Sequence, residues 1–204
     1  LYEKIVNFAR NHNIVVVNDN PYDFILNEGE HLSILQISGA KDFCIEFNSM
    51  SKSHNMPGWR VGMLATNAEF VSWILKIKSN IDSGTFRPLQ LAAAKAYENT
   101  DEWHTMANAE LYKSRRAIAE EIMEALGCDF NPQQQGMFLW GRVPVSYANV
   151  EELTERVLQE AKVFITPGFI FGSNGERYVR ISLCAKNDRM IEALRRIKNL
   201  KLTN

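Results

Sequence analysis

One short stretch of the chain gathers the residues best suited to chemistry. Ser49, Ser51 and Arg60 surround a single lysine, Lys52, within the segment Asn48–Gly62. Two hydroxyls and a guanidinium suit a phosphate, which needs several hydrogen-bond donors and positive charge. A lysine beside such an anchor is placed to form a Schiff base with the aldehyde of a phosphorylated cofactor. The alternative interpretation is a polar loop that contains an incidental lysine.

The elements around this stretch predict an α/β arrangement with a mainly parallel sheet. The apolar run Phe43–Phe47 predicts a strand that leads into the Lys52 loop, and the β-branched run Ile14–Val17 predicts a parallel strand buried on both faces. Asp19 and Tyr22 follow that run, at the sheet edge where ligands bind in open α/β sheets. Asp19 can accept from a protonated ring nitrogen and Tyr22 can donate to a phenolate oxygen, although an Asn/Asp/Pro turn is the competing interpretation.

Four segments resemble, in the right order, the motifs of class I/II aminotransferases, which are pyridoxal-phosphate enzymes of the aspartate aminotransferase fold. The four segments are Asn18–Tyr22, Ser49–Lys52 followed by Gly58–Gly62, Gln135–Trp140 and Tyr178–Ser182. Four ordered matches along the whole chain are far more specific than any one of them. The chain lacks an initiator methionine and begins inside a predicted helix, so we expect it to be the C-terminal half of a longer protein.

The resemblance implies a role for each candidate residue. Lys52 would be the catalytic residue and would hold the cofactor, pyridoxal 5′-phosphate. Asp19 would keep the pyridine nitrogen protonated, and Tyr22 would bond the 3-oxygen of the ring. The remaining cofactor-binding residues would be Ser49, Ser51 and Arg60.

Arg180 is the candidate substrate-binding residue. In the family, an arginine at this place binds the α-carboxylate of the substrate as a bidentate pair, which lysine cannot copy. The resemblance thus implies an aminotransferase that moves an amino group between an amino acid and a 2-oxo acid. The alternative interpretation is that Arg180, within the predicted strand Val179–Ser182, is a solvated charge on the outer face.

The pattern of elements predicts two domains. Residues 1–100 would be the C-terminal portion of the large cofactor domain, residues 101–127 an interdomain helix ended by Gly127, and residues 128–204 a small C-terminal α/β domain. The further expected strands are Met63–Thr66, Met137–Trp140, Val163–Ile165 and Tyr178–Leu183, and the expected helices are Leu1–Asn11, Glu69–Lys78, Leu89–Glu98, Asp101–Leu126, a helix after Asn149, and Asp188–Leu200. The resemblance also implies a homodimer, with the loop Asn80–Pro88 near the interface.

Composition and charge exclude several classes of function. The formal net charge is −1, so nothing points to nucleic acid or an anionic membrane as a partner. No apolar run approaches the roughly 20 residues of a membrane helix. Three scattered cysteines without a Cys-x-x-Cys spacing fit a reducing compartment and predict a cytoplasmic protein. The four histidines show no spacing typical of a metal site and are interpreted as structural or surface residues.

Two alternatives stay open at this point. Other pyridoxal-phosphate enzymes of the same fold, such as carbon–sulfur β-lyases and decarboxylases, share the chemistry of Lys52, Asp19 and Tyr22. An aminotransferase-like sensor domain of a transcription regulator would carry the same motifs. Within the family, Lys78–Gly84 most resembles the subgroup of alanine-type and LL-diaminopimelate aminotransferases.

Overall fold

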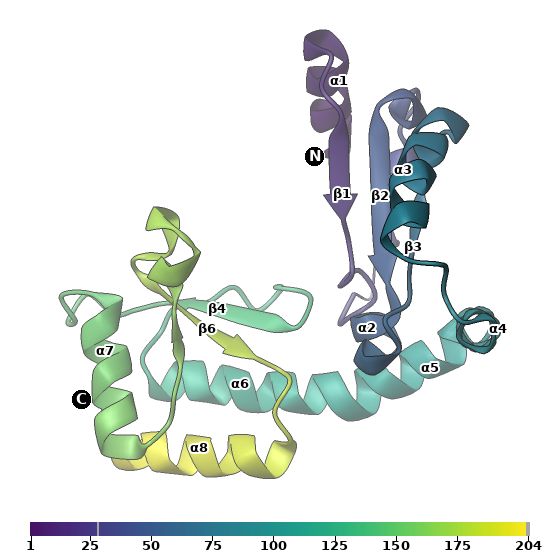
Figure 1. The fold of residues 1–204 in the computed structure, drawn as a ribbon. Helices are drawn as coiled ribbons and strands as arrows, with labels where there is room; N and C mark the ends of the chain where they lie inside the picture. The colour runs from purple at the N-terminus through teal and green to yellow at the C-terminus, as the bar shows by residue number, and fades with distance from the viewer. Residues whose placement is uncertain (28, 203–204) are drawn as a thin grey trace. The chain divides into compact units, whose positions relative to one another are not determined.

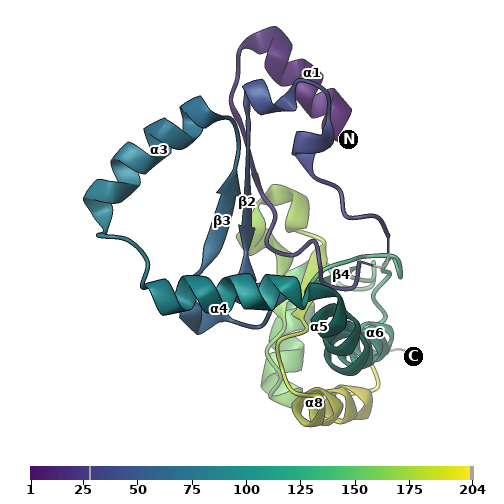
Figure 2. The same cartoon turned by 90° about the vertical axis from the view of Figure 1, so that its right-hand side faces the viewer.

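The structure, a computed structural model, describes residues 1–27 and 29–202, with the side chains of 108–110 also outside the description. These residues form two compact units, Leu1–Thr105 and Met106–Asn204. Each unit contains one three-stranded sheet (Figures 1 and 2). The last two residues of the expected C-terminal domain lie outside the described residues.

The Leu1–Thr105 unit is built on the sheet β1-β2-β3. β1 (Val16–Asp19) and β2 (Cys44–Ser49) pair in parallel as expected, with Asp19 opposite Phe47. β3 (Gly62–Ala65) runs antiparallel to β2, which the sequence pattern did not indicate. The helical elements of the unit are α1 (Tyr2–His12), η1 (Ile34–Gln36), η2 (Ala40–Asp42), α2 (Met50–Ser53), η3 (Pro57–Trp59), α3 (Ala68–Ile81), α4 (Arg87–Glu98) and α5 (Thr100–Met106).

A small core fixes α1 and the following loop against β2. Val6, Ile34, Ala40 and Cys44 are fully or almost fully buried together. α1 presents its apolar face to this cluster and ends at Asn13, which adopts the left-handed conformation common after a helix. The predicted helix at the start of the chain is therefore confirmed, and its packing holds β2 in place ahead of the Lys52 turn.

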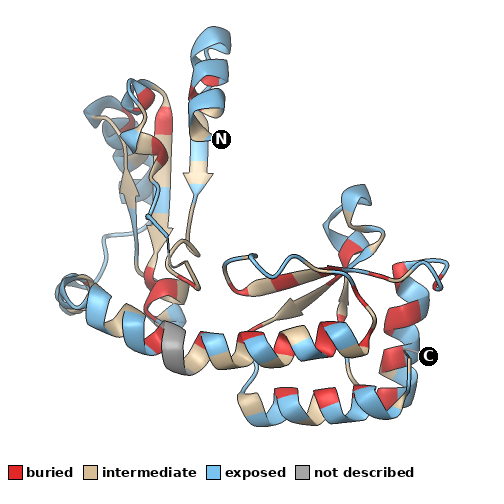
Figure 3. Ribbon diagram, turned by 180° about the vertical axis from the view of Figure 1, so that it is seen from behind, coloured by how far each residue is buried: buried red, intermediate tan, exposed pale blue. Residues whose placement is uncertain are grey.

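Two apolar faces in this unit are exposed, and the first contradicts an expectation from the sequence. Val15 and Val17 are 49% and 58% exposed, although their run predicted a strand buried on both faces. In α3, Phe70 is buried, whereas Leu75 and Ile77 are 60% and 65% exposed. Most of α3 is coloured as exposed in Figure 3. Within the described residues, no further layer covers these faces.

The Met106–Asn204 unit is built on the antiparallel sheet β4-β6-β5. α6 and α8 lie side by side on one face of this sheet (Figure 1). The helices and strands of the unit are η4, a π-helical segment (Ala107–Lys113), α6 (Ser114–Ala125), β4 (Phe138–Arg142), α7 (Val150–Arg156), its π-helical continuation η5 (Val157–Ala161), β5 (Thr166–Pro167), η6 (Gly168–Phe171), η7 (Ser173–Gly175), β6 (Tyr178–Ser182) and α8 (Asn187–Asn199).

Two helix signals in this unit are confirmed at atomic detail. Gly127 has φ +69°, and the N–H groups of Gly127 and Cys128 donate to the carbonyls of Glu124 and Met123, both at 2.9 Å. This is the Schellman arrangement that ends a helix. Asn149 accepts from the backbone N–H of Glu152 at 2.9 Å, as a capping residue does.

The expected strand Val163–Ile165 is wrong. β5 comprises only Thr166 and Pro167, which pair with Arg180 and Val179. Lys162 adopts a left-handed conformation at the end of the preceding helix, and the chain that follows pairs with β6 only from Thr166 onward. The apolar residues here reflect packing rather than strand pairing, since Ile165 is buried while Phe164 is 69% exposed.

Arg116 gives the first prediction, on stability. Its side chain is 7% exposed, pairs with Glu120 at 2.7 Å, and donates to the carbonyls of Gln134 at 2.8 Å and Pro132 at 3.2 Å. Arg116→Met keeps the volume but leaves buried acceptors unpaired, so we expect the free energy of unfolding to fall by about 2–4 kcal/mol. Urea unfolding measures this, with Arg195→Met as the exposed control. Equal urea midpoints for the two variants would contradict the prediction.

Candidate functional site

The carboxyl ends of β1 and β2 form one edge of the first sheet. Asn20, just after β1, donates its backbone N–H to the Phe47 carbonyl at 3.0 Å. The side-chain amide of Asn48 donates to the Asn20 carbonyl at 3.2 Å. The loop that follows Asp19 and the turn that follows Ser49 are therefore tied together, as parallel strands with a shared edge require.

Lys52 lies on a single helical turn, α2, directly after β2. Ser49 caps this turn, because its hydroxyl accepts from the Ser51 backbone N–H at 3.2 Å. Met50 is fully buried and anchors the turn in the unit. The Lys52 side chain is half-buried, and its amine makes no hydrogen bond or ion pair within the part of the chain that the structure describes. The amine is thus held at the sheet edge and left available to a ligand.

Arg60 returns to the same edge through a strained turn. Its φ of +54° lies in the left-handed region that a residue with a Cβ rarely adopts. Its guanidinium donates to the Pro57 carbonyl at 3.1 Å. The next residue, Val61, accepts from the Met50 backbone N–H at 3.3 Å, which joins the end of the Arg60 loop to the start of α2. A strained backbone beside such a turn is typical of functional sites.

Gly62 allows this loop to close. It pairs with Ser49 across β2 and β3, and a Cβ at this position would come within 2.8 Å of the Asn48 carbonyl oxygen. The two strands can approach there only because residue 62 is a glycine. The glycine that ends the Asn48–Gly62 segment therefore has a structural reason.

Asp19 and Tyr22 complete this edge. Asp19 is exposed at the end of β1, and within the described residues its carboxylate accepts no hydrogen bond. Tyr22 is half-buried in the turn that Ile25 closes by donating its N–H to the Tyr22 carbonyl at 2.9 Å. One unit therefore brings an amine, a carboxylate, a phenol, two hydroxyls and a guanidinium to one sheet edge. This donor set fits pyridoxal phosphate, which carries an aldehyde, a basic ring nitrogen, a phenolic oxygen and a phosphate.

Sequence reasoning missed the residues behind this edge. His54, interpreted from sequence only as structural or surface, is 6% exposed, and Ser53 beside it is 5% exposed. His54 contacts Thr100, and Tyr97 donates to Asn48. These partners lie more than 45 positions apart in sequence, so local spacing carries no signal for them. The only available hint was that His54 lies two residues from Lys52.

Arg180 belongs to the second unit and is half-buried on β6. Its guanidinium carbon lies 4.2 Å from the ring centre of Phe138, 4.0 Å from that of Phe171 and 5.9 Å from that of Trp140. Its Nε is buried and, within the described residues, has no hydrogen-bond partner. A buried donor without an acceptor is costly. The side chain is thus suited to bind an anion. It is not the fully solvated strand arginine of the alternative interpretation.

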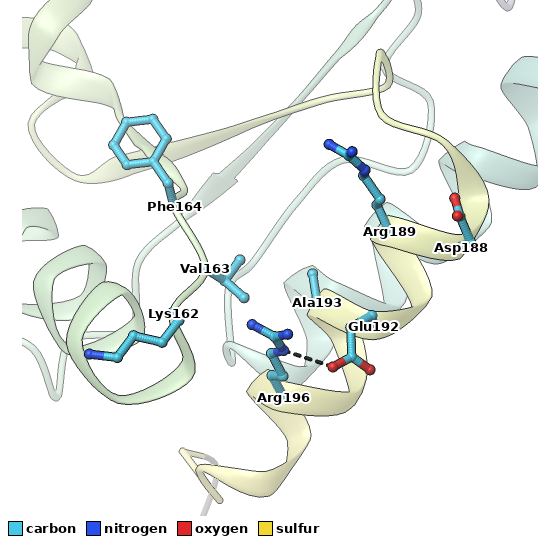
Figure 4. Close-up of a pocket in the computed structure, with 8 residues that line it drawn as sticks. All are labelled: Lys162, Val163, Phe164, Asp188, Arg189, Glu192, Ala193 and Arg196. Carbon is cyan, nitrogen blue, oxygen red and sulfur yellow. Dashed lines mark hydrogen bonds and ion pairs between the residues drawn. The ribbon is translucent and has the colours of Figure 1, made fainter.

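Two hollows flank the last helix of this unit. One, of about 750 Å³, is lined by Lys162–Phe164 and by residues of α8, among them Arg196 and Glu192, which form an ion pair at 2.8 Å (Figure 4). The other, of about 270 Å³, shares Phe164 and Arg189 with it and includes Arg180 in its lining. Of the residues predicted from sequence, only Arg180 lines either hollow.

Comparison with known proteins identifies the family. The sequence profile of aminotransferase class I and II matches residues 1–197. The chain belongs to the class I and II aminotransferase family. LL-diaminopimelate aminotransferase from Aquifex aeolicus is 41% identical over 202 residues, which cover 98% of this chain and 52% of that protein. Glutamate-pyruvate aminotransferase AlaC from Escherichia coli is 38% identical over 200 residues, which cover 97% and 48%.

Solved structures agree on the fold. BacF from Bacillus subtilis superposes with a TM-score of 0.87 at 30% identity, covering 98% of this chain and 51% of that one. An aromatic aminotransferase from Pyrococcus horikoshii gives 0.86 at 27% identity, covering 98% and 54%. The α/β fold expected of a pyridoxal-phosphate transferase is therefore confirmed. The chain spans about half the length of the curated relatives that it matches. In the described residues, no helix is long and apolar enough to cross a membrane.

Proposed function

We propose that these residues are the C-terminal half of a pyridoxal-5′-phosphate-dependent aminotransferase. The observation that carries the proposal is the position of Lys52 on a capped turn directly after β2, with Asp19 at the end of the neighbouring parallel strand. The exposed apolar faces of β1 and α3 support a missing half, since such faces normally pack against further structure. So does the coverage of only 52% of the Aquifex aeolicus relative.

The proposed domain assignment keeps the three parts expected from the sequence, whereas the two compact units divide between Thr105 and Met106. Residues 1–100 would belong to the large cofactor domain, residues 101–127 would connect the domains, and residues 128–204 would form the small domain. The full-length protein would be a homodimer, with Asn80–Pro88 near its interface. The three cysteines are free thiols, which supports a reducing compartment and hence the cytoplasm.

Each residue has a role that its chemistry allows. Pyridoxal phosphate supplies an electron sink for the bond that breaks at the substrate Cα. Lys52 would hold its aldehyde and would act as the general acid–base for the proton at the substrate Cα. Asp19 would accept from the ring nitrogen and keep it protonated, and Tyr22 would donate to the phenolic oxygen. The phosphate would be held by Ser49, Ser51 and Arg60.

Substrate binding falls to Arg180. Its Nε, which has no partner among the described residues, and the aromatic rings around its guanidinium favour a carboxylate in a sheltered site. The substrates would be an amino acid and a 2-oxo acid. The names of the relatives make LL-diaminopimelate, alanine and glutamate the first amino donors to test. Oxo-acid-dependent transfer would separate an aminotransferase from a β-lyase or a decarboxylase.

The second prediction identifies the anchoring lysine. Borohydride reduction of the full-length protein with bound pyridoxal phosphate should attach the cofactor to the peptide that holds Lys52, because this amine lies at the sheet edge without a protein partner in the described residues. Peptide mass spectrometry locates the attachment. Label on Lys41 or Lys76 in place of Lys52 would contradict the proposal.

A further inference from the structure

A chain of hydrogen bonds runs behind turn α2 in the first unit. The Ser53 hydroxyl donates to the Ser49 carbonyl at 3.0 Å and lies 2.9 Å from His54 Nδ1. His54 Nε2 lies 3.1 Å from the Thr100 hydroxyl, which donates to the Tyr97 carbonyl at 2.7 Å. The imidazole therefore bridges the turn that carries the candidate lysine and the end of α4.

The same chain continues to the other loop of the site. The Tyr97 hydroxyl donates to the side-chain oxygen of Asn48 at 3.2 Å, and the Asn48 amide donates to the Asn20 carbonyl at 3.2 Å. Asn20 directly follows Asp19. The rings of His54 and Tyr97 also pack edge to face, with centroids 5.2 Å apart. One network thus touches both loops that carry cofactor-binding candidates.

In this hydrogen-bond network, the number of available protons limits what the His54 ring can do. Burial lowers the pKa of His54, although the Ala96 backbone opposes this, so the neutral ring is favoured. A neutral imidazole has one N–H. The hydroxyl protons of Ser53 and Thr100 both go to carbonyls, so each hydroxyl can only accept from the ring. The Ala96 backbone is a third acceptor for the ring, so its single N–H serves Ser53, Thr100 or Ala96 but only one of them at a time.

We propose that His54 is a positioning residue for Lys52. The role assigns the ring proton to Nδ1, so that the ring donates to Ser53, leaves the Ser53 proton on the Ser49 carbonyl and fixes turn α2. Through Tyr97 and Asn48 it holds this turn in register with the loop after Asp19. The amine and the carboxylate would grip opposite ends of the pyridine ring, so their separation decides the fit. The inference rests on the proposed function.

The test compares replacements of His54 in the full-length protein. His54→Phe keeps a flat ring and removes both nitrogens, and pyridoxal phosphate should bind about 5- to 30-fold more weakly. An asparagine amide reproduces the position of Nδ1, and a glutamine amide that of Nε2. His54→Asn should therefore restore binding and the yield of borohydride-labelled Lys52 peptide, whereas His54→Gln should not. His12→Asn, exposed on α1, is the matched control.

The outcomes separate positioning from mere stability. A purely structural histidine would lower the melting temperature of the cofactor-free protein without a difference in cofactor binding between the asparagine and glutamine variants, and that result would overturn the inference. Wild-type binding by His54→Phe would also overturn it. If His54→Phe does not fold, Tyr97→Phe removes one hydroxyl of the same network and should weaken binding about 3- to 10-fold. Unchanged binding there would overturn the inference.

The proposed function and this inference fail differently. Wild-type protein that carries no label on Lys52 would overturn the proposed function, and the positioning role with it. Normal labelling of Lys52 in the wild type, together with variants that bind pyridoxal phosphate equally well, would overturn the positioning role alone.

Discussion

Replacing Lys52 with alanine should lower amino transfer by the full-length protein by at least about 10⁴-fold. Loss of a positioned general acid–base costs about 10²–10⁴ in rate on its own, and this variant also loses the covalent anchor. The fold should survive, because the Lys52 amine makes no hydrogen bond or ion pair within the described residues. The loss should thus appear in kcat at saturating substrate while the melting temperature of the cofactor-free protein stays close to that of the wild type.

The matched control is Lys41→Ala. Lys41 is exposed in the same unit, and its carbonyl, which the substitution keeps, accepts from the Asn67 side chain at 2.7 Å. This variant should retain wild-type activity. Steady-state rates with an amino donor and a 2-oxo acid measure both. If Lys52→Ala kept its rate within tenfold of the wild type, another residue would have to carry the chemistry and the assignment of Lys52 would be wrong.

The candidate site could be read from the sequence because its main parts follow strands. Asp19 lies at the end of one apolar run, and Ser49, Ser51 and Lys52 lie at the end of the next. Two successive parallel strands place their carboxyl ends at one edge, so the order along the chain was enough to bring the groups together. Parallel pairing of β1 and β2 confirms that step.

Burial could not be predicted in the same way. Ile14, Val15 and Val17, and the face of α3 at Leu75 and Ile77, carry the apolar pattern of covered elements, yet they are exposed. The apolar periodicity of a segment indicates which of its faces is suited to burial. It does not identify the residues that would pack on that face. In a chain that spans about half the length of its relatives, an apolar face therefore need not be buried by the residues at hand.

Contacts between distant residues could not be predicted either. His54 meets Thr100 across 46 positions, and Tyr97 meets Asn48 across 49. Local periodicity says nothing about such pairs. The same limit explains Val163–Ile165, where three apolar residues predicted a strand but pairing with β6 begins only at Thr166. Strand formation depends on a second segment with which to pair, and the apolar pattern of one segment does not show whether such a partner is present.

Replacing Arg180 with lysine should lower kcat/KM for amino acid substrates by about 30- to 1,000-fold. The estimate corresponds to about 2–4 kcal/mol, the scale of a charge-assisted pair lost from a sheltered site. Lysine keeps the positive charge but loses the planar fork that grips both oxygens of a carboxylate. It also loses stacking on the rings of Phe138 and Phe171, which lie 4.2 and 4.0 Å from the guanidinium carbon.

The effect should be confined to the substrate. The proposed cofactor-binding residues belong to the first unit and Arg180 to the second, so the affinity for pyridoxal phosphate should change little. Arg142→Lys is the matched control, because Arg142 is an exposed strand arginine on β4. It represents the solvated strand residue that Arg180 would be under the competing interpretation, and its replacement should leave kcat/KM unchanged.

Comparing substrates with and without a side-chain carboxylate offers a sharper test of the same role. If Arg180 grips the α-carboxylate, Arg180→Lys should weaken every amino acid by a similar factor, whatever its side chain, since all share that group. If Arg180 instead binds a side-chain carboxylate, Arg180→Lys should lower kcat/KM for glutamate and LL-diaminopimelate but not for alanine. The ratio of kcat/KM between wild type and variant for these three substrates decides between the two roles. An Arg180→Lys variant with wild-type kcat/KM for all three would rule out both, and the aromatic rings around the guanidinium would then serve stability alone.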